Sequence, residues 1–387
     1  MTRGVKIPLA AIAVLAAAMP AMASDAAAPA QRGVWKGKIG NYPVIACLSE
    51  DGMGRFKGAY YYLSRLSPIG LMPSDDGLQW LEHAHYEESG ATWRALTIKG
   101  DALSGEWTQD GRTLRIALSR EAWTPAEEFE EPCMAEPFLA PRAGGGSVVE
   151  GDAALDGQPY RTLTYTKPTH LDDAEISSFA LLPQQPGDGA INTALASEIP
   201  DGTYRSELMQ CMGQAIGVHG ADGYYGSFIA PTLITARWVN VRISYESYCG
   251  GAHPSHGYLY RAYDRQGGAE ADLFRWLSGT MVEHVPGDTS EQSYDLLQPA
   301  MCELILARPP VGEDGEEGPE PYEPECREVA LEEEFWTLGL SEKGMLFIPS
   351  MPHALTPCVA TFSVPWDELE PALSEKGRAE VAALRGH

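Results

Sequence analysis

Apolar and polar residues alternate at every second position through much of the chain between residues 34 and 140. Such alternation is typical of half-buried strands, and Gly- and Asp-containing turns separate the alternating segments. Short strands that follow one another in this way predict a small β-sandwich or barrel, with the strands running up and down as a meander. The predicted strands are residues 35–40, 43–48, 58–62, 78–82, 92–98, 102–107 and 113–118.

Helical and strand patterns mix in the second part of the chain. Residues 160–165 and 228–241 read as strands, whereas residues 190–197 and 206–212 have helical spacing. Three consecutive glycines in Pro141–Ser147 are entropically costly inside a helix or strand, so residues 141–149 are expected to form a linker. The predicted fold class is α+β. A β-rich module at 34–140 precedes an α+β domain with an antiparallel sheet at 150–387.

The strand pattern is interrupted at paired glycines in the middle of this second domain. Asn240–Tyr248 alternates, Gly250-Gly251 ends the regular pattern, and Tyr258–Tyr263 resumes it. Paired glycines allow a positive φ or a close backbone approach, so we expect a bulge or tight bend there.

The residues around these glycines carry the chain's clearest family resemblance. The run Tyr245-Glu-Ser-Tyr-Cys-Gly-Gly-Ala-His-Pro254, followed by Tyr263-Asp264 and Asp272-Leu-Phe274, resembles the extracytoplasmic domain of RsiV-type anti-sigma factors and the accessory region of PdaC-type peptidoglycan deacetylases. The resemblance covers roughly residues 150–387. Its weaker matches are Asp188–Asn192, Gly344–Pro349 with His353 and Cys358, and Val364–Leu369.

The chain departs from these relatives in two ways, because it shows neither a transmembrane anti-sigma segment nor a deacetylase domain. The sigma-factor role and the deacetylase chemistry are therefore not carried over. What the resemblance implies is recognition of lysozyme, as in the RsiV branch, or of a peptidoglycan-related ligand. The expected binding residues are an acidic loop at 309–334 together with Tyr248, Gly250, Gly251, His253 and Tyr258.

The N-terminus predicts export. Residues 1–23 resemble a secretory signal peptide, with Arg3 and Lys6 before an apolar run and an Ala-Met-Ala cleavage site. Residues 24–33 are Ala-rich and expected to be disordered, and no later stretch approaches a membrane span. A periplasmic or secreted location in a bacterium follows.

The net charge of the chain indicates which classes of partner it can bind. The full chain has a net charge of −26, which opposes binding to nucleic acid and would favour a cationic partner such as lysozyme. Acidic surfaces also serve solubility alone.

The seven cysteines predict disulfides, since an exported protein folds in an oxidising compartment. Spacing favours Cys47–Cys133 inside the N-terminal module and Cys302–Cys326 closing the acidic loop. The resemblance implies Cys249–Cys358, because both residues lie at the family-like strand ends, with Cys211 left free. Cys211–Cys249 stays open as an alternative, because spacing does not fix connectivity.

Motifs for catalysis are weak. His253, His256 and His353 could ligate zinc if they met in space, but the sequence has no His-Glu-x-x-His, Gly-x-Ser-x-Gly or phosphate-binding loop. We therefore predict no catalytic residue, metal or cofactor, and favour a non-enzymatic cell-envelope binding protein. The alternatives are an envelope glycan hydrolase that uses His253 with a carboxylate, and a structural envelope protein without a specific ligand.

Overall fold

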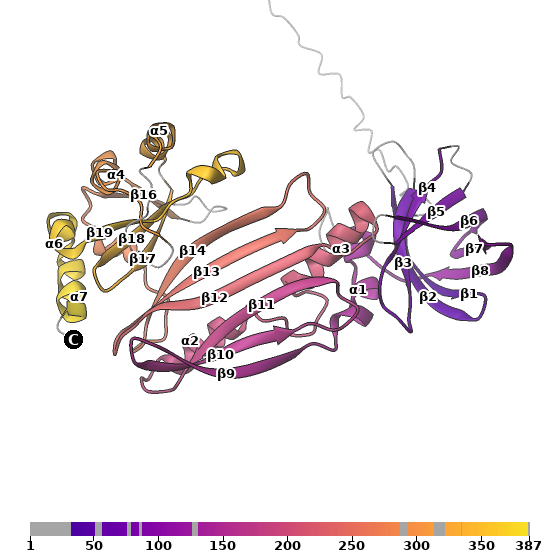
Figure 1. Ribbon diagram of the computed structural model, residues 1–387, viewed down its shortest axis with the longest axis horizontal. Coiled ribbons are helices and arrows are strands. Elements are labelled where there is room, and N and C mark those ends of the chain that lie inside the picture. The colour runs from indigo at the N-terminus through magenta and orange to yellow at the C-terminus, as the bar shows by residue number, and fades with distance from the viewer. Residues whose placement is uncertain are drawn as a thin grey trace, which may run out of the picture.

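The computed structural model describes residues 32–50, 56–75, 79–84, 87–125, 131–286, 293–312, 322–333 and 335–385. A barrel stands at one end, a long six-stranded sheet runs through the middle, and a three-stranded sheet with several helices forms the other end (Figure 1). This arrangement confirms the α+β class with a β-rich N-terminal part. The predicted signal peptide and most of the Ala-rich segment lie outside the described residues.

Eight antiparallel strands form the N-terminal module, each paired with the next, and β8 returns to β1 to close a barrel. The meander is thus confirmed, and of the two predicted architectures the chain adopts the barrel. The strands are β1 (Gly33–Ile39), β2 (Tyr42–Glu50), β3 (Phe56–Tyr62), β4 (Ile69–Pro73), β5 (Gln79–Ala84), β6 (Glu87–Lys99), β7 (Ala102–Gln109) and β8 (Arg112–Arg120).

Part of the barrel's outer wall is buried as well. Tyr60 lies in the interior, whereas Tyr61 points outward against Phe138, whose carbonyl oxygen accepts a 2.6 Å hydrogen bond from the Tyr61 hydroxyl. Phe138 belongs to α1 (Glu136–Ala143), which follows the short 3₁₀ segment η1 (Pro132–Met134). The Cys47–Cys133 disulfide joins β2 to η1, in agreement with the predicted pair.

The expected linker is shorter than predicted. Residues 141–143 complete α1, and β9 begins at Ser147, so only the three glycines at 144–146 lie outside regular structure. The helix extends this far because it packs on the barrel wall and on α3, and tertiary packing outweighs the low helix propensity of Pro141.

The central sheet has the order β14-β13-β12-β11-β10-β9. Its neighbours are antiparallel except for β11 and β12, which run parallel, so the prediction of an antiparallel sheet was wrong for one pair. Parallel neighbours need a crossover connection, which here contains two helices. The elements are β9 (Ser147–Leu155), β10 (Gln158–Thr166), β11 (Asp173–Leu181), α2 (Asp188–Ala196), α3 (Glu207–His219), β12 (Tyr224–Ile234), β13 (Trp238–Tyr248) and β14 (Ser255–Asp264).

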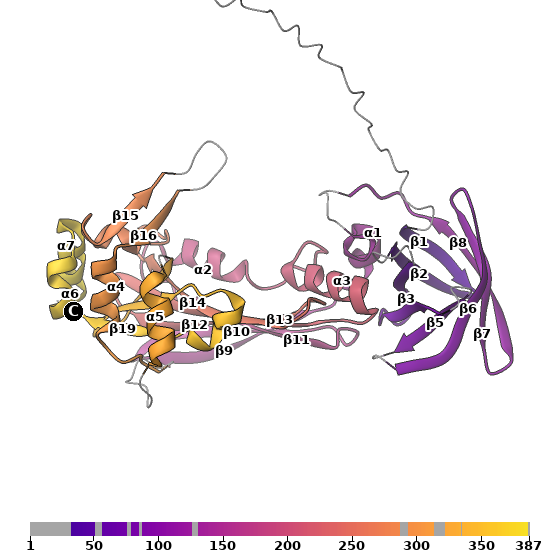
Figure 2. The same ribbon diagram turned by 90° about the horizontal axis from the view of Figure 1, so that it is seen from above.

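Helices α2 and α3 lie on one face of this sheet (Figure 2). Helix α3 begins after Ser206, whose hydroxyl caps the Met209 amide, and ends at Gly220 with φ of 77°. Among the helices that the structure describes, none is long and apolar enough to cross a membrane.

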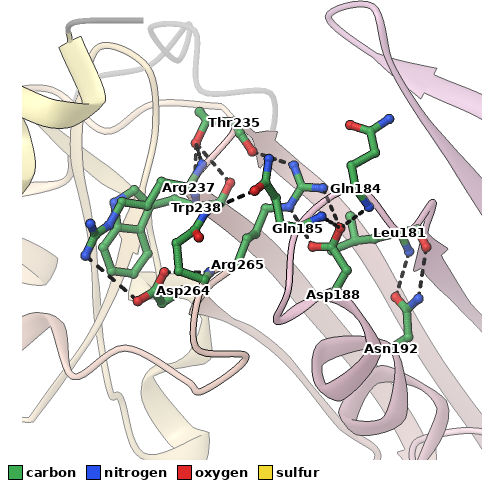
Figure 3. A network of polar contacts seen from close by, with 11 residues as sticks. Leu181, Gln184, Gln185, Asp188, Asn192, Thr235, Arg237, Trp238, Asp264 and Arg265 are labelled. Carbon is green, nitrogen blue, oxygen red and sulfur yellow. Dashed lines mark hydrogen bonds and ion pairs between the residues drawn. The ribbon is translucent and has the colours of Figure 1, made fainter.

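A buried polar network fixes α2 to the turn after β14 (Figure 3). Both oxygens of Asp188 accept hydrogen bonds from the Arg265 guanidinium, at 2.8 and 2.9 Å. The Asn192 amide pairs with both backbone groups of Leu181, at the end of β11. The Asp188–Asn192 segment therefore anchors α2, the first helix of the crossover connection, to the end of β11 and to the turn after β14.

The C-terminal part packs around one core, in which Trp276, Phe347 and Phe362 are almost fully buried. Of the expected acidic loop, residues 313–321 and 334 lie outside the described residues, and the part from Pro324 to Glu332 is helix α5 rather than loop. The elements are η2 (Leu273–Trp276), β15 (Val282–Val285), β16 (Tyr294–Leu297), α4 (Pro299–Leu306), α5 (Pro324–Glu332), β17 (Trp336–Leu340), β18 (Gly344–Pro349), η3 (His353–Cys358), β19 (Phe362–Pro365), α6 (Trp366–Leu369), η4 (Glu370–Ala372) and α7 (Glu375–Arg385).

Two predicted disulfides were wrong. Cys249 pairs with Cys211, the alternative left open, because α3 passes behind the end of β13 and brings the two Cα atoms to 4.7 Å. Cys358 pairs with Cys326, because α5 packs on η3. Cys302 takes part in none of the three disulfides and is buried inside the C-terminal core.

Candidate functional site

The paired glycines lie in the turn between β13 and β14, where Tyr248 and Gly250 face helix α3. The Tyr248 hydroxyl lies 2.9 Å from Nε2 of His219, and the two rings stack with centroids 5.7 Å apart. Gly250 has φ of 89°, and a Cβ there would come within 3.0 Å of Ala215 and Val218. These two predicted residues therefore hold the turn on α3.

Gly251 and His253 lie on the exposed part of the same turn. The His253 ring stacks on His353 of η3, with centroids 5.6 Å apart and an interplanar angle of 25°. This contact links the turn to the C-terminal part of the molecule. Across the residues with assigned positions, no three His, Cys, Asp or Glu side chains gather as a metal site.

A cleft of about 290 Å³ opens between the start of β14 and the β18–η3 segment. Tyr258 lines it and lies 3.1 Å, hydroxyl to hydroxyl, from Thr361, while the Arg242 guanidinium sits 5.0 Å from the Tyr258 ring centroid. The described lining contains Tyr245, which is 44% exposed, and the imidazoles of His256 and His353, but no carboxylate. Of the five predicted binding residues, Tyr258 lines this cleft and His253 lies beside it.

The sequence reasoning missed a second group of side chains, on the sheet face opposite α2 and α3. Tyr225 donates a hydrogen bond to Glu207 of α3, so the neighbouring Tyr224 points to the other face of β12. There the Tyr224 hydroxyl donates to the Glu246 carboxylate. Both side chains and the Phe228 ring lie over Gly226, within 3.1 Å of where its Cβ would be.

Two more carboxylates share this face. In the strand register Asp173 lies opposite Tyr224, and Glu175 lies opposite Gly226, which in turn lies opposite Glu246. Burial, the hydrogen bond to Glu246 and the nearby negative charges raise the pKa of Tyr224, so its hydroxyl stays protonated and remains a donor. We call the set Asp173, Glu175, Tyr224, Phe228 and Glu246 the acidic–aromatic face.

This arrangement is suited to binding cations rather than to acid–base catalysis. The three carboxylates are exposed to solvent and stand beside a tyrosine and a phenylalanine ring, which are the groups that attract Lys and Arg side chains. Alternation in residues 224–230 could have placed Tyr224 and Phe228 on one face of their strand. The sequence did not show which face the helices would cover.

Comparisons with known proteins give few matches. No protein-family model and no curated protein matches the chain. Among solved structures, a member of the DUF3298 family from Bacteroides fragilis is 14% identical, with 63% of this chain and 97% of that chain covered and a TM-score of 0.34. A DUF3298 family protein from Pseudomonas aeruginosa is 11% identical, with coverages of 60% and 94% and a TM-score of 0.29. Likenesses at this level decide neither the RsiV or PdaC kinship nor the function.

Proposed function

We propose that this chain is an exported, non-enzymatic cell-envelope protein that binds a cationic protein, of which lysozyme is the example that the family resemblance implies. The observation that carries the proposal is the acidic–aromatic face, where Asp173, Glu175 and Glu246 surround Tyr224 on the side of the sheet opposite the helices. Three disulfides fit the oxidising compartment that the proposal requires.

Charge supports the same partner class. With a net charge of −26, the chain would steer a cationic protein toward itself, and association would weaken as salt screens the field. A peptidoglycan glycan strand would gain less from the carboxylates than a basic protein, so we place the cationic protein first.

The lining of the β14–η3 cleft argues against the hydrolase alternative at that position. Glycoside hydrolysis uses two carboxyl groups on either side of the scissile bond. The described residues that line the cleft supply tyrosines, histidines and aliphatic side chains instead. The exposed Tyr245 in the same cleft argues against a purely structural role, because exposed aromatic residues commonly anchor interfaces.

The test is calorimetric titration of the mature protein with a c-type lysozyme at low and at moderate salt, with lysozyme activity measured in parallel. We expect binding that weakens with salt, and a roughly fivefold or greater loss of affinity in a Glu175→Gln/Glu246→Gln variant. The control is Glu150→Gln/Glu342→Gln, which removes the same charge from exposed positions elsewhere.

Three results are informative. Loss of affinity in the first variant alone supports the acidic–aromatic face as the contact surface. Equal losses in both variants would mean that only net charge matters, which would overturn the assignment of this face. If the wild-type protein does not bind lysozyme at either salt concentration, the proposed partner is wrong.

A further inference from the structure

The β14–η3 cleft receives aromatic side chains from both faces of the central sheet. Side chains alternate between the faces along a strand, so His256 and Tyr258 of β14 lie on one face and Gly257 lies on the other. Tyr245 of β13 is opposite Gly257 in the strand register and shares its face. Tyr245, His256 and Tyr258 all line the cleft, which therefore wraps round the edge of the sheet at β14.

Gly257 provides the space in which the Tyr245 ring lies. A Cβ at Gly257 would come within 2.5 Å of the Tyr245 hydroxyl oxygen and 2.8 Å of the ring carbon that bears it. Any larger residue at this position would therefore displace the ring. Because Tyr245 is 44% exposed, part of its side chain is accessible to a partner.

The end of β18 and η3 form the opposite wall of the cleft. Ile348, Pro349 and Met351 make this wall apolar, and His353 adds an imidazole that stacks on His253. Among the described residues that line the cleft, none is an Asp, Glu, Lys or Arg. The cleft is thus suited to a neutral ring, since aromatic side chains pair with one another and pack on apolar surfaces.

The size of the cleft limits its occupant to about one side chain. Its volume of about 290 Å³ is at the lower limit of the pockets that hold a drug-sized molecule. Hydroxyl groups of Ser255 and Ser350 line it as well and can accept a hydrogen bond from an indole N–H or a phenol O–H. A Trp or Tyr side chain matches both the rings and these acceptors.

The acidic–aromatic face lies next to the cleft. The exposed Glu246 is directly opposite His256 in the β13–β14 register, so the two side chains share a face and their Cβ atoms are about 5 Å apart. On the other side of Glu246, Gly226 and then Glu175 continue the same row across the sheet. A segment whose ring enters the cleft would therefore carry its neighbouring side chains over carboxylates, and charge complementarity favours a basic segment.

We propose that the β14–η3 cleft holds one Trp or Tyr side chain of the cationic protein, beside a Lys or Arg side chain that pairs with Glu246. The inference rests on the proposed function, because it names the part of the partner that the acidic–aromatic face and the cleft recognise together. Aromatic side chains that fill a pocket commonly carry much of the binding energy of an interface.

The experiment titrates the mature protein into the peptide acetyl-Lys-Gly-Trp-Gly-Lys-amide at low salt. In an extended chain the two-residue spacing places the Lys and Trp side chains on one face, roughly 7 Å apart. The Trp is a fluorotryptophan, so fluorine NMR reports on the ring itself, and the matched peptide with Ala in place of Trp is measured by competition. We expect saturable binding of the Trp peptide, with at least a roughly fivefold higher affinity than the Ala peptide.

Two variants test the position of the ring. Tyr245→Ala removes one wall of the cleft, and Gly257→Ala adds a methyl group where the Tyr245 hydroxyl lies. Each should lower the affinity of the Trp peptide roughly fivefold and leave that of the Ala peptide unchanged. Tyr42→Ala removes a tyrosine of the barrel that is 54% exposed, and it should change neither affinity.

The outcomes separate the cleft from the proposed function. Equal affinities of the two peptides, or no saturable binding of the Trp peptide, would overturn the inference, whereas the lysozyme titration decides the proposed function. Displacement of the Trp peptide by chitotriose would assign the cleft to a glycan and would also overturn it. Loss of affinity in Tyr245→Ala but not in Glu175→Gln/Glu246→Gln would contradict the charge contact on which the proposed function rests.

Discussion

The two adjacent glycines in the β13–β14 turn differ in how well each position would tolerate a side chain. Gly250 has a positive φ, and a Cβ there would come within 3.0 Å of α3. Gly251 is exposed, and a Cβ there would meet only the His253 carbonyl oxygen, at 3.7 Å. We expect Gly250→Ala to lower the free energy of unfolding by about 1–3 kcal/mol and Gly251→Ala to change it by less than about 0.5 kcal/mol. Urea unfolding measures both, and a larger loss at Gly251 would contradict the assignment of Gly250 to the α3 contact.

A second residue-scale prediction concerns Asp188. Its carboxylate is buried against Arg265, and replacing it by Asn leaves the guanidinium buried without its counter-charge. We expect Asp188→Asn to reduce the free energy of unfolding by about 3–5 kcal/mol. The matched control is Asp272→Asn, whose exposed partner Arg275 lies at 3.1 Å and whose loss should cost less than about 1 kcal/mol.

The Asp188–Arg265 pair also makes the stability of the fold depend on pH. Although burial opposes ionisation, the Arg265 guanidinium and the amides of Gln184 and Gln185 hold the pKa of Asp188 below its ordinary value. A depressed pKa contributes stability that is present above the unfolded-state pKa of about 4 and is lost as pH falls through the folded value. Unfolding midpoints measured from about pH 6 to pH 2 should therefore fall more steeply in the wild type than in Asp188→Asn. Parallel curves would contradict this contribution.

At the scale of elements, helix packing decides the cysteine pairing. Because α3 lies behind β13 and α5 lies on η3, non-reducing peptide mapping should recover Cys211–Cys249 and Cys326–Cys358. Cys302 should react with a maleimide only after unfolding, since it is buried in the C-terminal core. Recovery of a Cys302–Cys326 peptide would contradict this packing.

The Cys211–Cys249 link should also be measurable as stability. It closes a sequence separation of 38 residues, for which chain entropy gives about 2–4 kcal/mol. A Cys211→Ser/Cys249→Ser variant should lose that amount in urea unfolding. Cys302→Ser serves as a comparison that breaks no disulfide. A double variant as stable as the wild type would show that the link does not constrain the unfolded chain.

The elements predictable from sequence were those fixed by local pattern. Alternation located seven of the eight barrel strands and the β13–β14 hairpin, because a two-residue period reports one buried face, but it missed β4. The same period did not show that the outward-facing Tyr61 would be buried, because its burial depends on α1, which packs on the outer wall of the barrel. The parallel β11–β12 pair was also missed, because strand direction depends on how the two crossover helices pack.

The candidate site was predicted only in part for the same reason. The turn at Gly250-Gly251 followed from sequence, but the contact of Tyr248 with His219 depends on where α3 packs. The stacking of His253 on His353 joins residues 100 positions apart, which spacing cannot show. Glu82 of β5 likewise accepts hydrogen bonds from Tyr60 of β3, Trp93 of β6 and Trp107 of β7, which meet inside the barrel only because the sheet curls round.

At the scale of the whole molecule, one buried arginine ties the barrel to the central sheet. Arg142 of α1 is fully buried and donates from Nε to the Leu66 carbonyl oxygen of the β3–β4 connection, at 2.7 Å. Its NH2 group donates to both oxygens of Asp222, which precedes β12, at 2.9 and 2.8 Å. The barrel, α1 and the sheet therefore meet at a single side chain, and we expect them to unfold together.

Arg142→Met should break this coupling, because it leaves the Asp222 carboxylate buried without its partner. We expect a loss of about 3–5 kcal/mol and a calorimetric transition that splits into separate barrel and sheet components. Adding Asp222→Asn should recover part of the loss by removing the unpaired charge. Arg161→Met, which breaks an exposed pair with Asp152, should cost less than about 1 kcal/mol and keep one transition. A single transition in Arg142→Met would mean that the remaining barrel contacts, including Cys47–Cys133 and the packing of Tyr61, suffice to couple the two parts.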